Sequence, residues 1–150
     1  MRLSFFLLTL LVAGCQTRPP QETAASSPRA RVAPDAQLRE TRWVPRQLAG
    51  QLVAVPADSQ EPYLLLRADG TAEGNGSCNR FRGTFFSEKP GELKFSPLMS
   101  TRMACAAIAI ENEFTKALGQ SNSYRISGDT LLLFNATSTP VARLEAVYLR

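Results

Sequence analysis

The stretch YLLLRADGTAEGNGSCNRFRGTF, residues 63–85, carries most of the information about the fold. Tyr63–Leu66 is a short apolar run of the kind that forms β-strands. The pair Asp69-Gly70 follows it and is a strong signal for a tight turn, after which Thr71–Gly74 leads away again. The first half of the stretch therefore predicts a β-hairpin.

The second half of the stretch predicts another strand after a corner rich in glycine and asparagine at residues 74–76. Phe81 and Phe85 are four positions apart, so they share one face of an extended chain. The positions of opposite parity are polar: Arg80, Arg82 and Thr84. This alternation is typical of a strand that buries one face and exposes the other.

The same type of pattern continues on both sides of this stretch. Four further regions have strand character: the run that begins at Trp43-Val44, Glu92–Phe95 after the turn Pro90-Gly91, the pair Ser123–Ile126 and Thr130–Phe134 around Ser127-Gly128-Asp129, and Val141–Tyr148. Short strands at close spacing with turn signals between them indicate antiparallel pairing.

One helix is expected over residues 106–118, where Ile110, Phe114 and Leu118 recur every four residues. Gly119 is the expected terminator. We expect the apolar stripe to pack on the sheet, and a groove for a partner helix is the less favoured alternative. The predicted fold is mainly β (α+β), a small antiparallel β-barrel-like domain over residues 41–150 with one α-helix packed on the sheet.

The N-terminus has the layout of a secretion signal, predicted for residues 1–14. Arg2 precedes the mainly apolar run Leu3–Val12, which is about half of the roughly 20 residues that a membrane-spanning helix needs. The small residues 12–14 before Cys15 resemble the lipobox of bacterial lipoproteins. An ordinary signal peptide cut near Ala13 is the alternative.

The lipobox resemblance implies that Cys15 is the lipidation site and the first residue of the mature protein. It implies diacylglycerol on the thiol and an acyl chain such as palmitate on the new amino group. Several acyl chains give a stable membrane anchor, whereas one binds only marginally. Gln16 in place of an aspartate resembles an outer-membrane address, so we expect a lipid anchor in the outer membrane with the protein on its periplasmic face.

Residues 15–40 are predicted to be a disordered tether between the lipid and the domain. The segment is rich in Pro, Ala, Ser, Gln and Arg and has almost no large apolar side chain. Such a composition buries too little surface to offset the entropy lost on ordering.

The composition argues against an enzyme. The sequence contains no histidine, which removes the commonest general base and most zinc sites. Glu111 and Glu113 are two apart on the predicted helix and therefore point to different faces, so they form no catalytic pair. The net charge of +4 has no Lys/Arg stripe behind it, so no nucleic-acid partner is expected. We also expect no catalytic residue, no metal, no cofactor and a monomer.

Two cysteines remain once Cys15 is assigned to the lipid, and in an oxidising periplasm Cys78 and Cys105 suggest a disulfide. A bridge closing the loop between them is worth roughly 3.5 kcal/mol in the chain-entropy model. A metal site with two sulfurs and no histidine is less favoured. A redox-active pair is also less favoured, because the spacing is not Cys-x-x-Cys.

The segments around these cysteines resemble the paired signature of the META domain, the HslJ-like family of bacterial envelope proteins. The resemblance rests on Ser77-Cys78-Asn79-Arg80-Phe81-Arg82-Gly83, Gly91-Glu92-Leu93 and Thr101-Arg102-Met103-Ala104-Cys105 in that order. Ser77 departs from the pattern, because Gly or an apolar residue is common there. Ala106-Ala107 departs as well, where Pro or a polar residue is common.

The family resemblance implies a barrel-like fold with one helix, similar to the cracked barrel of secretion-system pilot lipoproteins. It implies a non-enzymatic role in the cell envelope, in heat shock or antibiotic stress tolerance, with an envelope protein or lipid as partner. The alternative is a pilot or chaperone that grips an apolar tail or lipid during outer-membrane or secretion-system assembly, which predicts an apolar groove beside the helical stripe.

A disulfide would bring together the candidate binding surface, made of Asn79, Arg80, Arg102 and Met103. Arginine side chains there are suited to bidentate contact with a carboxylate or phosphate. The favoured alternative is that Asn79 satisfies a turn and the arginines cap carbonyls or lie in solvent.

Overall fold

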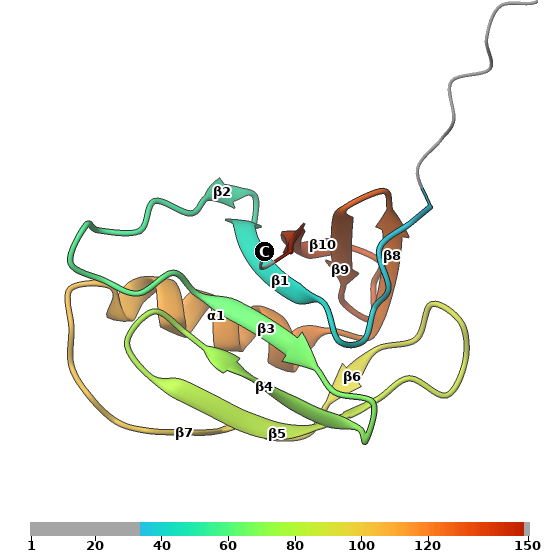
Figure 1. The fold of residues 1–150 in the computed structure, drawn as a ribbon, viewed down its shortest axis with the longest axis horizontal. Coiled ribbons are helices and arrows are strands. Elements are labelled where there is room, and N and C mark those ends of the chain that lie inside the picture. Colours follow the sequence, from blue (N-terminus) through green and yellow to red (C-terminus); the bar gives the residue numbers. More distant parts are fainter. Residues whose placement is uncertain (1–33, 149–150) are drawn as a thin grey trace, which may run out of the picture. The chain divides into compact units, whose positions relative to one another are not determined.

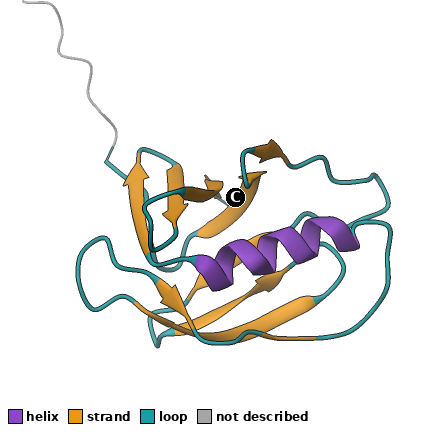
Figure 2. Ribbon diagram, turned by 180° about the vertical axis from the view of Figure 1, so that it is seen from behind, coloured by secondary structure: helices purple, strands orange, loops and turns teal. Residues whose placement is uncertain are grey.

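One antiparallel sheet organises residues 34–148, the part of the chain that the computed structural model describes (Figure 1). Its strand order is β6-β5-β4-β3-β1-β10-β9-β8, with β2 on β1 and β7 on β5. The strands are β1 (Arg42–Leu48), β2 (Gln51–Leu52), β3 (Tyr63–Leu66), β4 (Thr71–Asn75), β5 (Arg80–Phe86), β6 (Lys94–Phe95), β7 (Met99–Ser100), β8 (Ser123–Ser127), β9 (Thr130–Phe134) and β10 (Pro140–Val147). The helix α1 spans Ile108–Gln120 and crosses one face of the sheet (Figure 2).

The predicted fold class is confirmed, since the strands pair antiparallel and one helix packs on them. The sheet is not closed into a barrel, because its order ends at β6 and β8. The two ends approach each other through a single bridge between Glu92 and Ser123 and through the hydrogen bonds Leu93 N–H to Asn122 O and Tyr124 N–H to Gly91 O. The sheet is therefore curved like part of a barrel but remains open.

The hairpin and the alternating strand lie where the sequence predicts them. β3 pairs with β4 through the turn in which Gly70 adopts φ +87°, a conformation that suits glycine. On β5, Phe81 and Phe85 are buried while Arg80 and Arg82 are exposed. The ring of Phe81 meets the edge of the Phe114 ring at 5.9 Å, which joins the sheet to the helix in one core.

The helix begins and ends later than the sequence indicates. It starts at Ile108, and Gly119 lies inside it, so the prediction of Gly119 as terminator is wrong. Ser121 ends the helix instead: it is extended (φ −65°, ψ 133°), its N–H donates to Leu118 O at 3.1 Å, and its hydroxyl donates to Ala117 O at 2.9 Å. These two bonds satisfy carbonyls that a helix end leaves open, so no glycine is required.

The packed chain begins before Thr41, where the sequence analysis places the start of the domain. Ala36 and Leu38 are buried in the core cluster. Asp35 Oδ1 accepts a hydrogen bond from Gly128 N–H at 2.7 Å, and the Ala36 N–H donates to Gly128 O at 2.9 Å. The last residues of the predicted tether are therefore held by contacts that composition does not reveal, from Asp35 and Ala36 to the β8–β9 turn and from the Glu40 N–H to Leu66 O.

The predicted signal, residues 1–14, Cys15 and the tether up to residue 33 lie outside the described residues. Among the described residues, no helix is long and apolar enough to span a membrane.

Candidate functional site

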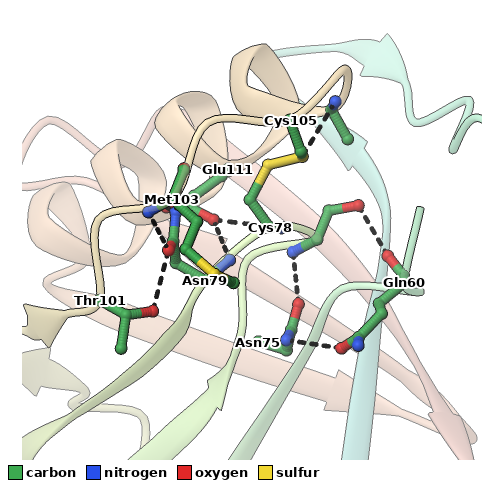
Figure 3. Close-up of a disulfide and its surroundings, with 10 residues drawn as sticks. Gln60, Asn75, Cys78, Asn79, Thr101, Met103, Cys105 and Glu111 are labelled. Atoms are coloured by element: carbon green, nitrogen blue, oxygen red, sulfur yellow. Dashed lines mark hydrogen bonds between the residues drawn. A yellow bond between two sulfur atoms is a disulfide. The ribbon is translucent and has the colours of Figure 1, made fainter.

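A disulfide between Cys78 and Cys105 joins the β4–β5 corner to the segment just before α1, with the two Cα atoms 5.9 Å apart (Figure 3). The Ala107 N–H donates to the Cys105 sulfur at 3.3 Å and the Ile108 N–H to the Cys105 carbonyl at 3.2 Å. The cysteine thus satisfies two N–H groups at a helix start that has no side-chain cap. We call Cys78, Asn79, Cys105 and Glu111 the disulfide corner.

Asn79 points into the corner and is only 2% exposed (Figure 3). Its Oδ1 accepts hydrogen bonds from the Thr101 hydroxyl at 2.8 Å and the Met103 N–H at 2.7 Å. Its Nδ2 donates to the Met103 carbonyl at 3.0 Å and to Glu111 Oε1 at 2.8 Å. The Asn79 amide therefore makes all of its hydrogen bonds within the protein. It holds residues 101–103 in place and has no group left to bind a ligand.

Glu111 is a central residue of the disulfide corner. In the sequence it stands out only beside Glu113, as a pair of glutamates that the helical spacing separates. It is buried, and its Oε2 accepts the backbone N–H groups of Asn79 at 2.7 Å and Cys78 at 3.3 Å. Its place in the first turn of α1 also suits a negative charge. Glu113 is exposed and lies 3.5 Å from Lys116, so the two glutamates face different ways, as their spacing predicts.

The glycine-rich corner before Cys78 is shaped by Glu111. A Cβ at Gly76 would lie 2.5 Å from Glu111 Cγ, so only glycine fits there without moving the carboxylate. Ser77 adopts φ +102°, a conformation that favours glycine. Two hydrogen bonds hold it there: Ser77 N–H to Asn75 Oδ1 at 2.7 Å and Ser77 Oγ to Gln60 O at 2.6 Å. This explains in physical terms the departure from the motif noted in the sequence.

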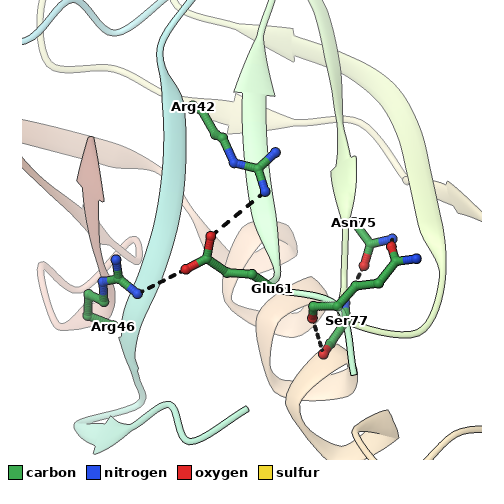
Figure 4. Close-up of polar contacts among 6 residues, drawn as sticks. Arg42, Arg46, Glu61, Asn75 and Ser77 are labelled. Atoms are coloured by element: carbon green, nitrogen blue, oxygen red, sulfur yellow. Dashed lines mark hydrogen bonds and ion pairs between the residues drawn. The ribbon is translucent and has the colours of Figure 1, made fainter. Parts of the chain in front are cut away.

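The loop that supplies Gln60 is fastened to β1 by an ion-pair cluster (Figure 4). Glu61 lies 3.3 Å from Arg46 and 3.9 Å from Arg42. The Arg42 guanidinium also stacks on Tyr63 at 3.7 Å from the ring centroid. These side chains are partly exposed, so the cluster orients the loop more than it stabilises the fold.

The segment that the corner holds, residues 99–104, we call the strip. Met99 is 75% exposed and Met103 62% exposed, and Arg102 is exposed between them. Within residues 34–148 the Arg80, Arg82 and Arg102 side chains make no ion pair. In the strip, an arginine without an ion pair, Arg102, therefore lies beside two large exposed apolar side chains.

The four residues of the candidate binding surface do not form one cluster. Asn79 and Met103 meet, but only through the hydrogen bonds that bury Asn79. Arg80 lines a hollow of about 620 Å³ on the outer side of the sheet, and Arg102 and Met103 line a second one of about 740 Å³ beside α1. The expected convergence of the two arginines is wrong, because they lie on either side of the strip.

The apolar stripe of α1 is mostly covered. Phe114 and Leu118 are fully buried in the core, so no groove runs along the whole stripe. Ile110 is half-buried and lines a hollow of about 340 Å³ with Leu52, Val53 and neighbouring residues. Any apolar ligand at the stripe is limited to this end of it.

The described residues show no arrangement of three His, Cys, Asp or Glu side chains suited to hold a metal ion. The side chains whose pKa values are clearly shifted lie on the surface, outside the disulfide corner. The Thr71 backbone N–H, donated to Asp69, lowers the pKa of that carboxyl, and the hydrogen bond to Asp129 raises the pKa of Tyr148.

Comparison with known proteins gives one family and a shared fold. The family model of the META domain matches residues 36–148. A protein solved by NMR aligns with TM-score 0.57 and 24% identity, over 72% of this chain and 90% of its own. A DUF4847-family protein from Bacteroides vulgatus ATCC 8482, solved by crystallography, aligns with TM-score 0.49 and 20% identity, over 59% of this chain and 61% of its own. No curated protein gives a significant match.

Proposed function

Because this chain belongs to the META domain family, we propose that it is a non-enzymatic binding protein, anchored by lipid at Cys15 to the periplasmic face of the outer membrane. The META domain family is not known as enzymatic. We further propose that the protein serves the cell envelope during heat or antibiotic stress by binding an envelope partner.

The observation that carries the binding role is the way the disulfide corner is used. Its polar groups make their hydrogen bonds within the protein: Asn79 and Glu111 bond to each other and to backbone groups. The disulfide links Cys78, next to Asn79, to Cys105, next to the end of the strip. The result is a strip held in place while Arg102 and Met103 stay exposed. Arginine and methionine are enriched at protein interfaces, and a preorganised surface loses little entropy on binding.

The anchor is supported by the signal-like N-terminus and by the lipobox around Cys15. We expect labelled palmitate to be incorporated into the wild-type protein and not into Cys15→Ala. We expect Cys15→Ala to move from the membrane fraction to the soluble fraction. A protein that stays unlabelled, or that is membrane-bound without Cys15, would refute the anchor alone.

The binding role is tested by complementation in a strain that lacks the gene. Wild-type protein is expected to restore survival at raised temperature and in novobiocin, and Arg102→Ala is expected to fail while accumulating to the same level with the same thermal midpoint. Lys89→Ala is the matched control, an exposed cation away from the strip. Full rescue by Arg102→Ala, or no phenotype of the deletion, would contradict the proposal.

A pilot or chaperone role is the second candidate, supported by the apolar hollow beside Ile110. The hollow is open to an apolar side chain or a lipid tail, with exposed Leu52 at its rim. Under this role Leu52→Glu blocks recovery of a crosslinked outer-membrane assembly and Arg102→Ala does not. The reverse pattern favours the strip as the binding surface.

A further inference from the structure

We propose that the strip is the open edge of the sheet to which an extended, acidic segment of a partner protein adds as a further strand, lying in a groove between the strip and α1. This inference deepens the proposed binding role of the same site. It names the backbone of the strip, and not only its side chains, as the recognition element.

The N–H and C=O groups of successive residues of the strip point alternately toward β5 and away from it. Thr101 N–H donates to Arg80 O on β5 at 3.2 Å, and Met103 is bonded on both its N–H and its C=O by the Asn79 side chain. Ser100, which lies opposite Phe81, comes just before these bonded positions, and Arg102 lies between them. In an antiparallel pair such intervening residues turn their N–H and C=O away from the partner strand. Ser100 and Arg102 therefore present backbone donors and acceptors outward.

The side chain of Asn79 continues the hydrogen bonding of the strip beyond the start of β5. β5 begins at Arg80, so no strand residue is left to pair with Met103. The Asn79 amide takes the place of the missing backbone partner, since it bonds both the N–H and the C=O of Met103. An edge held in this way is a ready template for an added strand.

The groove beside this edge has a defined wall. On α1 the residues Ile108, Asn112, Thr115 and Gly119 follow one another at helical spacing on one face and line the hollows next to residues 95–104. Two hollows of about 740 and 480 Å³ share Leu98, Asn112 and Thr115, so they form one continuous groove. From Ile108 to Gly119 the helix rises about 16 Å, which matches about five residues of extended chain.

The charge of the groove selects the occupant. Arg102 lies at one end, and Lys116, which is paired with Glu113, lies at the other. The groove's acidic residue, Glu111, is buried and has three N–H donors on its carboxylate. A segment with a carboxylate side chain facing Arg102 is therefore favoured over a neutral or basic one.

The proposal is tested with a random heptapeptide phage library, selected on the full chain in detergent. Peptides that bind are expected to be enriched in Asp or Glu and to lack central proline, which cannot donate to the edge. Arg102→Glu should weaken a selected peptide about tenfold or more, and replacing the peptide's acid with Lys should restore binding to that variant. Arg80→Glu, an exposed arginine on the other side of the strip, should change affinity less than about twofold.

Strand addition is read separately by amide hydrogen exchange. Bound peptide is expected to slow exchange at Ser100 and Arg102 about tenfold or more, because their N–H groups gain partners. Unchanged exchange there would overturn strand addition. So would selected peptides whose binding depends on Arg80 and not on Arg102, a selection without acidic peptides, and binding only to phosphatidylglycerol vesicles or to a second copy of the chain.

These outcomes are distinguishable from failure of the proposed function. Peptide binding and exchange read the edge itself and need neither a lipid at Cys15 nor a stress phenotype. Rescue by Arg102→Ala refutes the stress role and leaves the peptide measurements standing.

Discussion

Replacement of the buried carboxylate, Glu111→Gln, is expected to destabilise the domain by about 2–3 kcal/mol, since a buried hydrogen bond to a charged group is worth about this much. Glu111 Oε2 accepts two backbone N–H groups and Oε1 accepts the Asn79 amide. Glutamine has one oxygen, so its own NH₂ must face a donor. Asn79 cannot flip to accommodate it, because its Oδ1 already accepts from Thr101 and Met103.

The larger change, Glu111→Ala, removes all three acceptor contacts and leaves the Asn79 N–H buried without a partner. We expect a loss of about 3–5 kcal/mol, a large part of the 5–15 kcal/mol typical of a domain. The assay is urea unfolding of a fragment of residues 32–150, which contains the whole described part of the chain, residues 34–148. Trp43 is the single tryptophan and is fully buried, so its fluorescence reports on the core.

The matched control is Glu113→Gln, an exposed carboxylate on the same helix that pairs only with Lys116. It should change the free energy of unfolding by less than about 0.5 kcal/mol. Asn79→Ala combined with Glu111→Gln should cost at least about 1 kcal/mol less than the sum of the single changes, because both disrupt the same network. A Glu111→Gln variant as stable as wild type, or strict additivity, would refute the role assigned to the corner.

Three further predictions concern the same domain. Reduction of the Cys78–Cys105 bridge, which closes a sequence separation of 27, should lower the free energy of unfolding by about 3.5 kcal/mol, measured by urea unfolding with and without reductant. Ser77→Gly should be about 1 kcal/mol more stable than Ser77→Ala, because both lose the hydroxyl bond and only glycine relieves the φ of +102°. The lowered pKa of Asp69 means that its carboxylate stabilises the fold above the unfolded pKa and loses this effect as the pH falls through the folded pKa, so Asp69→Asn should flatten the acid side of a thermal-midpoint profile.

Each of these has its own control. A Cys78→Ser, Cys105→Ser double variant should match the reduced protein and no longer respond to reductant. Asp58→Asn, an exposed carboxyl of another turn, should leave the acid profile unchanged. If Ser77→Gly were no more stable than Ser77→Ala, the strain assigned to that corner would be wrong.

Local patterns predicted most of the sheet, and particular residues show why. The alternation around Phe81 and Phe85 reports which side chains are buried, since the side-chain period of a strand is two. Asp69-Gly70 reports a turn, because the turn demands a backbone conformation that glycine supplies. By contrast, the prediction that Gly119 ends the helix was wrong. Ser121 ends it through hydrogen bonds that the helix propensities of single residues do not predict.

The candidate site was only partly predictable. Its cysteines and Asn79 stand out in the sequence by their motif, but their roles depend on Glu111, which lies 32 residues from Asn79 along the chain. A glutamate at the start of a helix is common and carries no signal of burial. The separation of Arg80 from Arg102 was likewise hidden, because it depends on which side of the strip each side chain takes.

The sequence by itself determined most of the strands and turns, the presence of one helix, the spacing of the two cysteines and the resemblance to the META domain. These follow from periodicity and from residue types whose preferences act within a few residues. Only the tertiary structure decided that the sheet stays open, that Ala36 and Leu38 join the core, and that Asn79 and Glu111 together hold the strip in place. Those outcomes are contacts between distant segments, and their energies depend on which groups find a partner once the whole chain has packed.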